Sequence, residues 1–531
     1  MPVSQPGTHQ NWKPAHNPWV IAMTVTLATF MEVLDSSIAN VALPHIAGSL
    51  GATFDEATWI LTSYLVSSAI VLPVSGWLST RVGRKRFYMS CVVLFTVCSF
   101  FCGIAPSLPM LIIARVLQGA GGGGLQPSEQ AILADSFPTE KRGMAFAMYG
   151  MAVVMAPAIG PTLGGWITDN FNWHWIFFIN IPVGLLSLFL TQRFVEDPPW
   201  LKQERTSGIK IDYIGLGLIV LGVACFQMVL DKGQEDDWFS SPLITTLLSI
   251  GLPTLAAFFL WEWYHENPIV DVRLLKNRNF GTAVFLSFVL GMVLFGSTVL
   301  IPEFLQNSLG YTAERAGLAL SPGGLMLMVM MPIAGRITAT KLDPRILVTI
   351  GFLGTAATLR LMTVIYLQMD FNTIVLLRMV QVMFMPFIFI PISTLNYIGV
   401  PREKNNQVSG MSNFARNLGG SIGTSLLGTL LARQNQAHQQ AFGQHTNYGN
   451  PNFERLLDGL KNAFMAQGFD AVTAAKKALA MAYQMTLGQG SALSFESTFW
   501  LMSVVVACLA PLPFLMRRPK HGEQQGSLAA H

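Results

Sequence analysis

Charged residues are scarce in this chain: they make up only 12% of its 531 residues, whereas 51% are hydrophobic. Soluble globular proteins usually carry about 25% charged residues. So few charges over this length leave too little polar surface to cover a water-soluble body. The composition therefore indicates a polytopic membrane protein, and the small net charge of +4 does not imply a nucleic-acid partner.

Cysteine is also rare, and all five cysteines lie within apolar runs. An odd number at such positions argues against a disulfide framework. Cys91, Cys98 and Cys102 have helical spacing and could form a soft-metal face, but small buried membrane residues are the simpler interpretation. The chain has no HExxH zinc motif and no GxxxxGK[ST] phosphate loop, which disfavours ATP as an energy source. We expect no cofactor and no metal.

Long apolar runs, in contrast, fill most of the chain. A membrane-crossing helix needs about 20 mostly apolar residues. Segments of this kind begin near Trp19, Trp59, Phe87, Leu108, Met144, Trp175, Ile211, Pro242, Phe280, Ala316, Ile346, Asn372, Gln407 and Thr498. With a cytoplasmic N-terminus, most of the 33 lysines and arginines fall on the cytoplasmic side, which supports that orientation and fourteen spans.

Two similar loops suggest that the chain contains two related halves. "GWLSTRVGRKRF" (76–87) follows the second span, and a degenerate copy, "GRITATKLDPRI" (335–346), follows the tenth. Transporters often consist of such halves, with the substrate site between them. The expected all-α layout is a cytoplasmic tail 1–17, a six-helix bundle 18–195, two inserted helices 211–263, a second six-helix bundle 279–516 and a cytoplasmic tail 517–531. The second bundle includes a long loop, 433–497, on the non-cytoplasmic side, which begins rich in Gln and Asn and then has the pattern of amphipathic helix in "FERLLDGLKNAFMAQ" (453–467) and "DAVTAAKKALAMAYQM" (470–485).

Ionisable residues inside the spans are the main functional candidates, because charge in a bilayer is costly. Glu32 and Asp35 lie three residues apart on one face of the first span. Asp35 should lie ~12 Å below the outer boundary and Arg115 of the fourth span ~10 Å below it. If these spans face each other, Asp35 and Arg115 can pair across a cavity. Such a pair is either a proton switch or a fixed structural ion pair, and Glu32 offers a second carboxylate.

Other polar residues within the spans are candidates for lining a substrate cavity. An anionic substrate group could bind Arg378 of the twelfth span or Arg416 of the thirteenth. The full set of cavity candidates is Asn40, Gln118, Arg378, Asn413 and Arg416.

The glycine run "RVLQGAGGGGLQP" (115–127) contains the GxGxxG spelling of a dinucleotide-binding turn. That turn must follow a strand and open a helix. Here an apolar helical segment leads into the glycines, so phosphates would have to bind inside the hydrocarbon layer. We interpret the run as a bare helix face on which a neighbouring span packs closely.

Four stretches together resemble one known family. They are "LDSSIANVALP" (34–44), "GWLSTRVGRKR" (76–86), "RVLQGAGGGG" (115–124) and "APAIGPTLGGWI" (156–167), the last followed by "WHWIFFINIPVG" (173–184). In this order and spacing they are similar to the motifs of the major facilitator superfamily, specifically its fourteen-span drug:proton antiporters of the EmrB/QacA type. The likeness extends from about residue 18 to the C-terminus. One departure is Thr80, which stands where the loop motif usually has aspartate and puts the family's gate contact in doubt.

The resemblance implies the major facilitator fold and a set of residue roles. Asp35 and Arg115, with Glu32 nearby, would take part in proton coupling. The conformational motifs would comprise Gly76, Arg81, Gly83, Arg84, Lys85, Gly119, Gly160, Pro161, Gly164 and Gly165. Of these, Gly160, Pro161, Gly164 and Gly165 would shape a bend and close helix packing.

The resemblance also implies a function and partners. The chain would export hydrophobic and amphipathic drugs across a bacterial inner membrane by alternating access, driven by the proton gradient. It would be no enzyme, and it would work with an EmrA-like periplasmic adaptor and a TolC-like outer-membrane channel. The loop 433–497 lies on the side where an adaptor could bind, but a solvated cap without a partner is the alternative. A dedicated exporter of one compound, such as a siderophore or fatty acid, and a non-transporting membrane sensor remain alternative functions.

Overall fold

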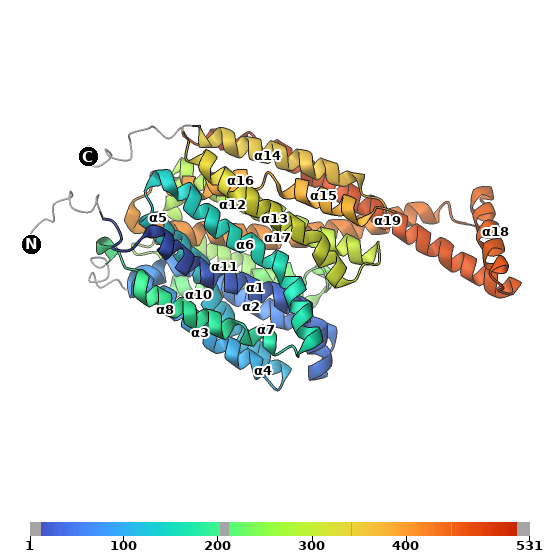
Figure 1. Cartoon of the computed structure of the whole chain (residues 1–531), viewed down its shortest axis with the longest axis horizontal. Helices are drawn as coiled ribbons and strands as arrows, with labels where there is room; N and C mark the ends of the chain where they lie inside the picture. The colour runs from blue at the N-terminus through green and yellow to red at the C-terminus, as the bar shows by residue number, and fades with distance from the viewer. Residues whose placement is uncertain (1–11, 202–211, 341, 448, 518–531) are drawn as a thin grey trace, which may run out of the picture.

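The protein is an all-α bundle in the computed structural model, which describes residues 12–201, 212–340, 342–447 and 449–517. The described residues contain no strand. Most helices run roughly parallel to the long axis, and the start of α1 and the end of α19 lie at the same end of the bundle (Figure 1). We call this the termini end and the opposite one the far end. Most of the two expected tails, residues 1–11 and 518–531, lies outside the described residues.

Each half of the bundle begins with a long helix and crosses back and forth between the two ends. The helices of the N-terminal half are α1 (Pro18–Leu50), α2 (Phe54–Val82), α3 (Arg84–Gly103), α4 (Leu108–Gly122), α5 (Leu125–Ser136), α6 (Thr139–Asn170), α7 (Trp175–Phe178) and α8 (Asn180–Phe194). The inserted pair is α10 (Tyr213–Lys232) and α11 (Pro242–Tyr264). The C-terminal half comprises α12 (Arg278–Asn307), α13 (Ala313–Thr338), α14 (Pro344–Leu361), α15 (Phe371–Val382), α16 (Pro386–Leu395), α17 (Asn405–Gly443), α18 (Pro451–Ala466) and α19 (Ala471–Leu509).

Within the described residues, twelve helices are long and apolar enough to cross a membrane, and a bent pair within α6 makes thirteen. Three of the twelve combine two α-helices, namely α4 with α5, α7 with α8 and α15 with α16. α17 does not qualify by composition, because amides and glycines lower its hydrophobicity, although its 39 residues are long enough. These findings are consistent with fourteen spans, and that number stays a prediction.

The expected loop 433–497 is largely helical, as its amphipathic stretches 453–467 and 470–485 indicated, but two of its helices continue the flanking apolar segments without a break. α17 continues to Gly443, and α19 runs unbroken from Ala471 into the last apolar segment. The reason is that alanines and amides predominate in these stretches and no proline interrupts either helix. With α18, they form an arm that extends beyond the far end of the bundle (Figure 1).

The two halves meet along a small set of helices. α6 packs against α13 and α16, while α17 packs against α2 and α5. α10 contacts both α2 and α17, so the inserted pair lies beside the seam between the halves. This arrangement brings the polar residues of α1, α5, α6 and α17 toward a shared interior.

Candidate functional site

Asp35 and Arg115 form a buried ion pair in the N-terminal half. Arg115 Nη1 donates to Asp35 Oδ2 at 2.6 Å, and the two residues are 0% and 2% exposed, respectively. Gln118 Nε2 and Asn180 Nδ2 donate to the other carboxylate oxygen at 3.1 and 2.6 Å. Ser99 accepts hydrogen bonds from both amides, at 2.7 and 3.2 Å. We call these five residues the Asp35 cluster.

The pair differs from the sequence expectation in one respect, because no cavity separates its members. α4 packs mainly against α2 and α3, and the long Arg115 side chain reaches past α2 to Asp35 on α1. Its Nε donates to the carbonyl of Ile60 at 3.2 Å, and its guanidinium lies 4.3 Å from the centre of the Tyr64 ring. Arg115 is therefore fixed by packing, hydrogen bonds and charge at once.

The glycine run explains how α4 comes close enough for these contacts. A Cβ atom on Gly119 would lie only 2.4 Å from the backbone oxygen of Tyr64. Only a residue without a side chain allows this approach, and Gly119 lies one turn beyond Arg115. The helix then ends at Gly122, and α5 continues the same crossing from Leu125. The run is thus a packing surface within a helix and not a turn after a strand.

Glu32 forms a second buried site one turn before Asp35. It accepts hydrogen bonds from the Tyr64 hydroxyl at 3.2 Å and from Gln126 Nε2 at 2.9 Å. Tyr64 also stacks on Arg115, so it contacts both carboxylate sites. The two acids therefore share a neighbour but have separate hydrogen-bond partners.

Arg416 connects this region to the C-terminal half. Its Nη2 donates to Gln126 Oε1 at 2.9 Å, to the Tyr149 hydroxyl at 2.8 Å and to Asn413 Oδ1 at 2.5 Å. Because Gln126 also donates to Glu32, a continuous polar chain runs from Glu32 on α1 to Arg416 on α17. Motion between the halves must break or rearrange this chain.

Two of the predicted cavity residues lie elsewhere. Asn40 is exposed, and its amide donates to the backbone oxygen of Ser36 at 3.1 Å. Arg378 is buried in the C-terminal half, where it bonds to Gln381 and Thr298. The structure therefore joins Gln118 to the Asp35 cluster and Asn413 to Arg416, but it brings neither Asn40 nor Arg378 to them.

The loop motif "GWLSTRVGRKR" (76–86) holds the two halves together at the termini end of the bundle. Arg84 forms a buried ion pair with Asp135 of α5, and its Nε donates to Asn406 Oδ1 of α17 at 2.6 Å. Asn406 in turn donates to the Thr80 hydroxyl at 3.2 Å, while the neighbouring Asn405 donates to Asp135 at 2.6 Å. Thr80 thus takes part in the gate contact through a hydrogen bond, although it replaces the usual aspartate.

The remaining motif residues have distinct local roles. Gly76 lets α2 approach α17, since a Cβ there would lie 2.7 Å from the Asn406 backbone oxygen. Gly83, with φ of 99°, makes the turn between α2 and α3. Lys85 donates through Nζ to the backbone oxygen of Gln192 at 2.8 Å, and the Arg81 guanidinium lies 5.5 Å from the Trp77 ring.

In the stretch "APAIGPTLGGWI" (156–167) of α6, one of the four motif residues does not behave as expected. The helix bends by 40° after Pro157, near the predicted site, and Cβ atoms on Gly160 and Gly164 would press on Ser37 and Ile38 of α1. A Cβ on Gly165, however, would meet no atom within 4 Å. Gly165 therefore does not serve close packing in this conformation, because its face of the helix points into open space.

Several residues of the site were missed by the sequence interpretation. Asn180, Ser99, Gln126, Tyr149 and Asn406 all hold key hydrogen bonds, yet none carries a charge. The available signal was a polar amide or hydroxyl within an apolar run, as for Asn180 in "WHWIFFINIPVG" and Gln126 at the end of the glycine run.

Two patterns associated with enzyme chemistry can be compared with the described residues. Those residues contain no group of three or more His, Cys, Asp or Glu residues that could hold a metal ion. Gly419–Gly423 spells the GxSxG of a serine nucleophile, but it lies inside α17 and not on a strand-to-helix turn. The Ser421 hydroxyl accepts a hydrogen bond from Gln227 of α10 at 2.9 Å, which ties the inserted pair to α17.

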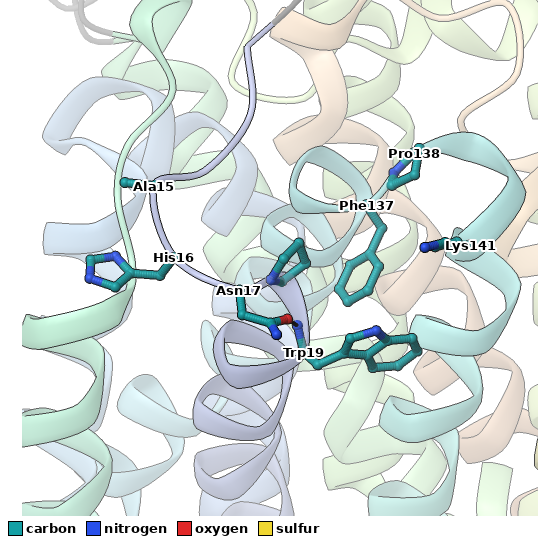
Figure 2. A pocket seen from close by; sticks show the side chains of 8 residues that line it. Ala15, His16, Asn17, Trp19, Phe137, Pro138 and Lys141 are labelled. Atoms are coloured by element: carbon teal, nitrogen blue, oxygen red, sulfur yellow. Dashed lines mark hydrogen bonds between the residues drawn. The ribbon is translucent and has the colours of Figure 1, made fainter.

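A surface pocket at the termini end is separate from these clusters. Figure 2 shows its lining residues, which come from the start of α1 and the connection between α5 and α6. Trp19 and Phe137 meet there edge to face, with ring centres 4.9 Å apart. Asp35 lies sixteen residues further along α1, or ~24 Å away. The pocket is thus no part of the buried polar interior.

Comparison with known proteins identifies the same architecture. Residues 25–424 match the family described as Major Facilitator Superfamily. The chain is 40% identical over 486 residues to the multidrug export protein EmrB of Haemophilus influenzae, covering 91% of this chain and 93% of that protein. It is 36% identical over 505 residues to the fatty acid resistance protein FarB of Neisseria gonorrhoeae, covering 95% and 96%, respectively.

Solved structures show the same fold at low identity. The proton:xylose symporter XylE superposes with a TM-score of 0.59 at 16% identity, covering 95% of this chain and 96% of that protein. At this identity the likeness concerns the fold alone.

Proposed function

The chain belongs to the major facilitator superfamily as an EmrB-like member, and on this premise we propose that it exports hydrophobic and amphipathic compounds in exchange for protons. The carrying observation is the buried Asp35–Arg115 pair, because an ion pair sealed inside a membrane protein is costly and marks a functional site. The proposal comprises secondary active transport by alternating access, without a bound cofactor.

The geometry of the Asp35 cluster supports a proton-operated switch. In the closed arrangement the ionised carboxylate accepts three hydrogen bonds, from Arg115, Gln118 and Asn180. Protonation of Asp35 removes the charge that holds Arg115 and leaves the guanidinium free to seek other partners. Because Tyr64 contacts both Arg115 and Glu32, a shift of Arg115 can reach the polar chain to Arg416. Proton binding would thereby bias the packing of the two halves.

We place the termini end in the cytoplasm of a bacterial cell and the arm at the periplasmic face of the inner membrane. The lysine and arginine distribution supports this orientation. On this proposal, the contacts among Arg84, Asp135 and Asn406 hold the cytoplasmic side closed.

The arm supports a tripartite assembly with an EmrA-like periplasmic adaptor and a TolC-like outer-membrane channel. α18 and the start of α19 extend beyond the bundle and expose apolar side chains, among them Leu456, Val472 and Tyr483. Replacing 451–466 with a short glycine-serine linker should weaken co-purification of the adaptor while proton-driven uptake into inverted vesicles persists. Unchanged co-purification would remove α18 from the partner proposal.

A dedicated exporter of one compound class is the second candidate function. The observation that favours it is the similarity to FarB, whose name refers to fatty acid resistance. A panel of cationic, neutral and anionic substrates in one transport assay separates this candidate from a multidrug exporter. A membrane sensor without transport activity would move none of them.

The decisive experiment measures proton flux in proteoliposomes that hold a pH gradient. Substrate should discharge the gradient with the native chain, and Asp35→Asn should abolish the response. The matched control is Asp55→Asn, which makes the same chemical change at an exposed position at the start of α2. Proton coupling by Asp35 would be wrong if Asp35→Asn responded as the native chain does.

A further inference from the structure

Each half of the protein contains a buried arginine followed three residues later by a buried glutamine, on the fourth membrane-crossing segment of that half. Arg115 and Gln118 lie on the fourth crossing of the N-terminal half, and Arg378 and Gln381 lie on the fourth crossing of the C-terminal half. In both pairs the arginine Nη1 donates to the glutamine three residues on, at 2.7 and 2.5 Å. Each glutamine then donates to a buried serine, Ser99 or Ser297, at 2.7 or 3.2 Å.

The two clusters share the arginine, the glutamine and a serine, although the serines lie on different helices, α3 and α12, and they differ most in the carboxylate. Arg115 pairs with Asp35, midway along the first helix of its half. On α12, the first helix of the C-terminal half, Arg378 instead meets the hydroxyl of Thr298 at 3.3 Å, in the second half of that helix. Among the described side chains, no carboxylate lies within ion-pair distance of Arg378, and its buried Nε has no hydrogen-bond partner. We call Arg378, Gln381, Ser297 and Thr298 the Arg378 cluster.

A buried arginine without a nearby anion has no counter-charge for its guanidinium group. A guanidinium has five N–H donors and matches carboxylate geometry with two parallel hydrogen bonds. Burying a charge without a partner is costly, and such charges are normally paired. Each arginine keeps one buried nitrogen without a hydrogen-bond partner, Nη2 of Arg115 and Nε of Arg378. The halves differ in the counter-charge, because Arg115 has Asp35 and Arg378 has none among the described side chains.

The surroundings place the Arg378 cluster beside the seam between the halves. The Arg378 stem lies against Gly323 of α13, where an added Cβ would lie 3.0 Å from its Cγ. On the same helix, a Cβ added at Gly317 would lie 3.1 Å from Pro161 of α6, and a Cβ added at Gly150 of α6 would lie 3.0 Å from Met331. α13 thus connects the cluster to the interface at which transporters bind their substrates.

We propose that the Arg378 cluster is an anion subsite that binds the oxyanion head of a hydrophobic substrate, which takes the place that Asp35 occupies in the other half. This inference rests on the proposed export function and specifies the substrate class. The ligand is a monoanionic carboxylate or sulfonate on an apolar body: its head pairs with Arg378, and its chain lies along the apolar faces of α13 and α15. A cation of similar size gains nothing from this site.

The test measures binding of labelled decanesulfonate to the full chain in phosphatidylcholine nanodiscs, with empty nanodiscs as background. The sulfonate is ionised at every working pH, so it carries no proton. Arg378→Gln should weaken binding at least tenfold, and Arg378→Lys should retain part of it. Thr298→Asp should also weaken binding at least tenfold, because it installs the missing carboxylate beside Arg378. Since this variant keeps the arginine and pairs it, it guards against misfolding as the cause of lost binding.

Two controls make the result specific. Arg360→Gln removes the same charge from an exposed position near the end of α14 and should leave binding within twofold of the native chain. Decyltrimethylammonium, with the same chain and the opposite charge, should bind Arg378→Gln at least as well as the native protein. Native affinity of both Arg378→Gln and Thr298→Asp for decanesulfonate would overturn the proposal, and so would displacement of the probe by an equal concentration of inorganic phosphate.

Failure of the anion subsite and failure of the proposed proton-coupled export can be told apart. Loss of proton-driven transport in Asp35→Asn tests the coupling, and decanesulfonate affinity of Arg378→Gln tests the subsite. If Asp35→Asn still couples protons while Arg378→Gln loses the anion, the coupling proposal fails and the subsite stands. If Asp35→Asn loses proton coupling while Arg378→Gln still binds the anion, the coupling proposal stands and the subsite proposal fails.

Discussion

The Nε atom of Arg84 lies 2.6 Å from the Oδ1 atom of Asn406, although 322 residues separate them along the chain. This hydrogen bond joins the end of the α2–α3 loop to the start of α17 and therefore links the two halves at the termini end. Both side chains are buried, and Arg84 is also paired with Asp135. Separation of the two halves at this end would have to break the bond.

Asn406→Ala should therefore favour opening of the termini end. A buried hydrogen bond to a charged group contributes about 1.5–3 kcal/mol, so its loss should raise the open population roughly tenfold or more. The measurement is the rate at which an impermeant maleimide labels Ala147→Cys, a buried position where α6 meets α13. The background carries Cys508→Ser, which removes the exposed native cysteine.

Asn372→Ala serves as the control for this prediction. It removes the same amide from an exposed position at the far end and should not change the labelling rate. Equal labelling of Asn406→Ala and Asn372→Ala would show that the Arg84–Asn406 bond does not hold the gate.

Arg115→Met should destabilise the protein more than the loss of one contact would suggest. The substitution leaves Asp35 buried without its counter-charge, and breaking a buried pair in this way costs about 3–5 kcal/mol. The double variant Asp35→Asn/Arg115→Met removes both charges and should recover much of the lost stability, measured as Tm in detergent. It should nevertheless show no proton-coupled transport. Equal Tm values for the single and double variants would indicate that the pair is not energetically coupled.

The charged residues of the site could be predicted from the sequence, whereas its neutral polar residues could not. Asp35 and Arg115 could be paired because both charges stand out in apolar spans and helix rise places them at one depth. Asn180 could not, because a neutral amide produces no comparable signal and its approach depends on how α8 packs on α1. Likewise, no local pattern connects Arg84 with Asn406, since their contact arises from the docking of two halves.

The fold shows the same division. Apolar length and the related loops indicated the helical membrane architecture, and amphipathic spacing indicated helix at 453–467 and 470–485 within the long loop. The sequence interpretation did not predict that residues 433–443 and 471–497 continue α17 and α19 without a break. Helix formation there follows from backbone propensity and the absence of breakers, which hydropathy does not measure.

Two glycines from the family motifs should respond oppositely to the same substitution. Gly119→Ala places a Cβ 2.4 Å from the backbone oxygen of Tyr64, so α4 must shift away from α2. Overpacking of this kind typically costs about 1–3 kcal/mol and would also displace Arg115. Gly165→Ala meets no atom within 4 Å and should be neutral or stabilise α6 by up to about 1 kcal/mol. Thermal unfolding of both variants provides the measurement, and a lower Tm for Gly165→Ala than for Gly119→Ala would contradict the packing argument.

An ion pair outside the membrane should make stability depend on pH. Asp271, in the connection between α11 and α12, binds Lys404 Nζ at 2.6 Å and Arg273 Nε at 3.1 Å. Burial alone would raise the pKa of Asp271, but the hydrogen bonds and charges of Lys404 and Arg273 outweigh it and hold the pKa below its usual value of 3.8. Since the folded pKa is the lower one, the carboxylate stabilises the fold above the unfolded value, and this stabilisation is lost as pH falls through the folded pKa.

Asp271→Asn should consequently lower the Tm at pH 7, with a loss of about 1 kcal/mol because Lys404 is partly exposed. The difference from the native chain should stay constant down to pH about 5 and shrink below pH about 4, as Asp271 becomes protonated in the native chain as well. Glu266→Gln, at an exposed position in the same connection, should show no such pH-dependent difference. A difference between Asp271→Asn and the native chain that persisted unchanged at pH 3 would mean that the carboxylate acts through its shape and not through its charge.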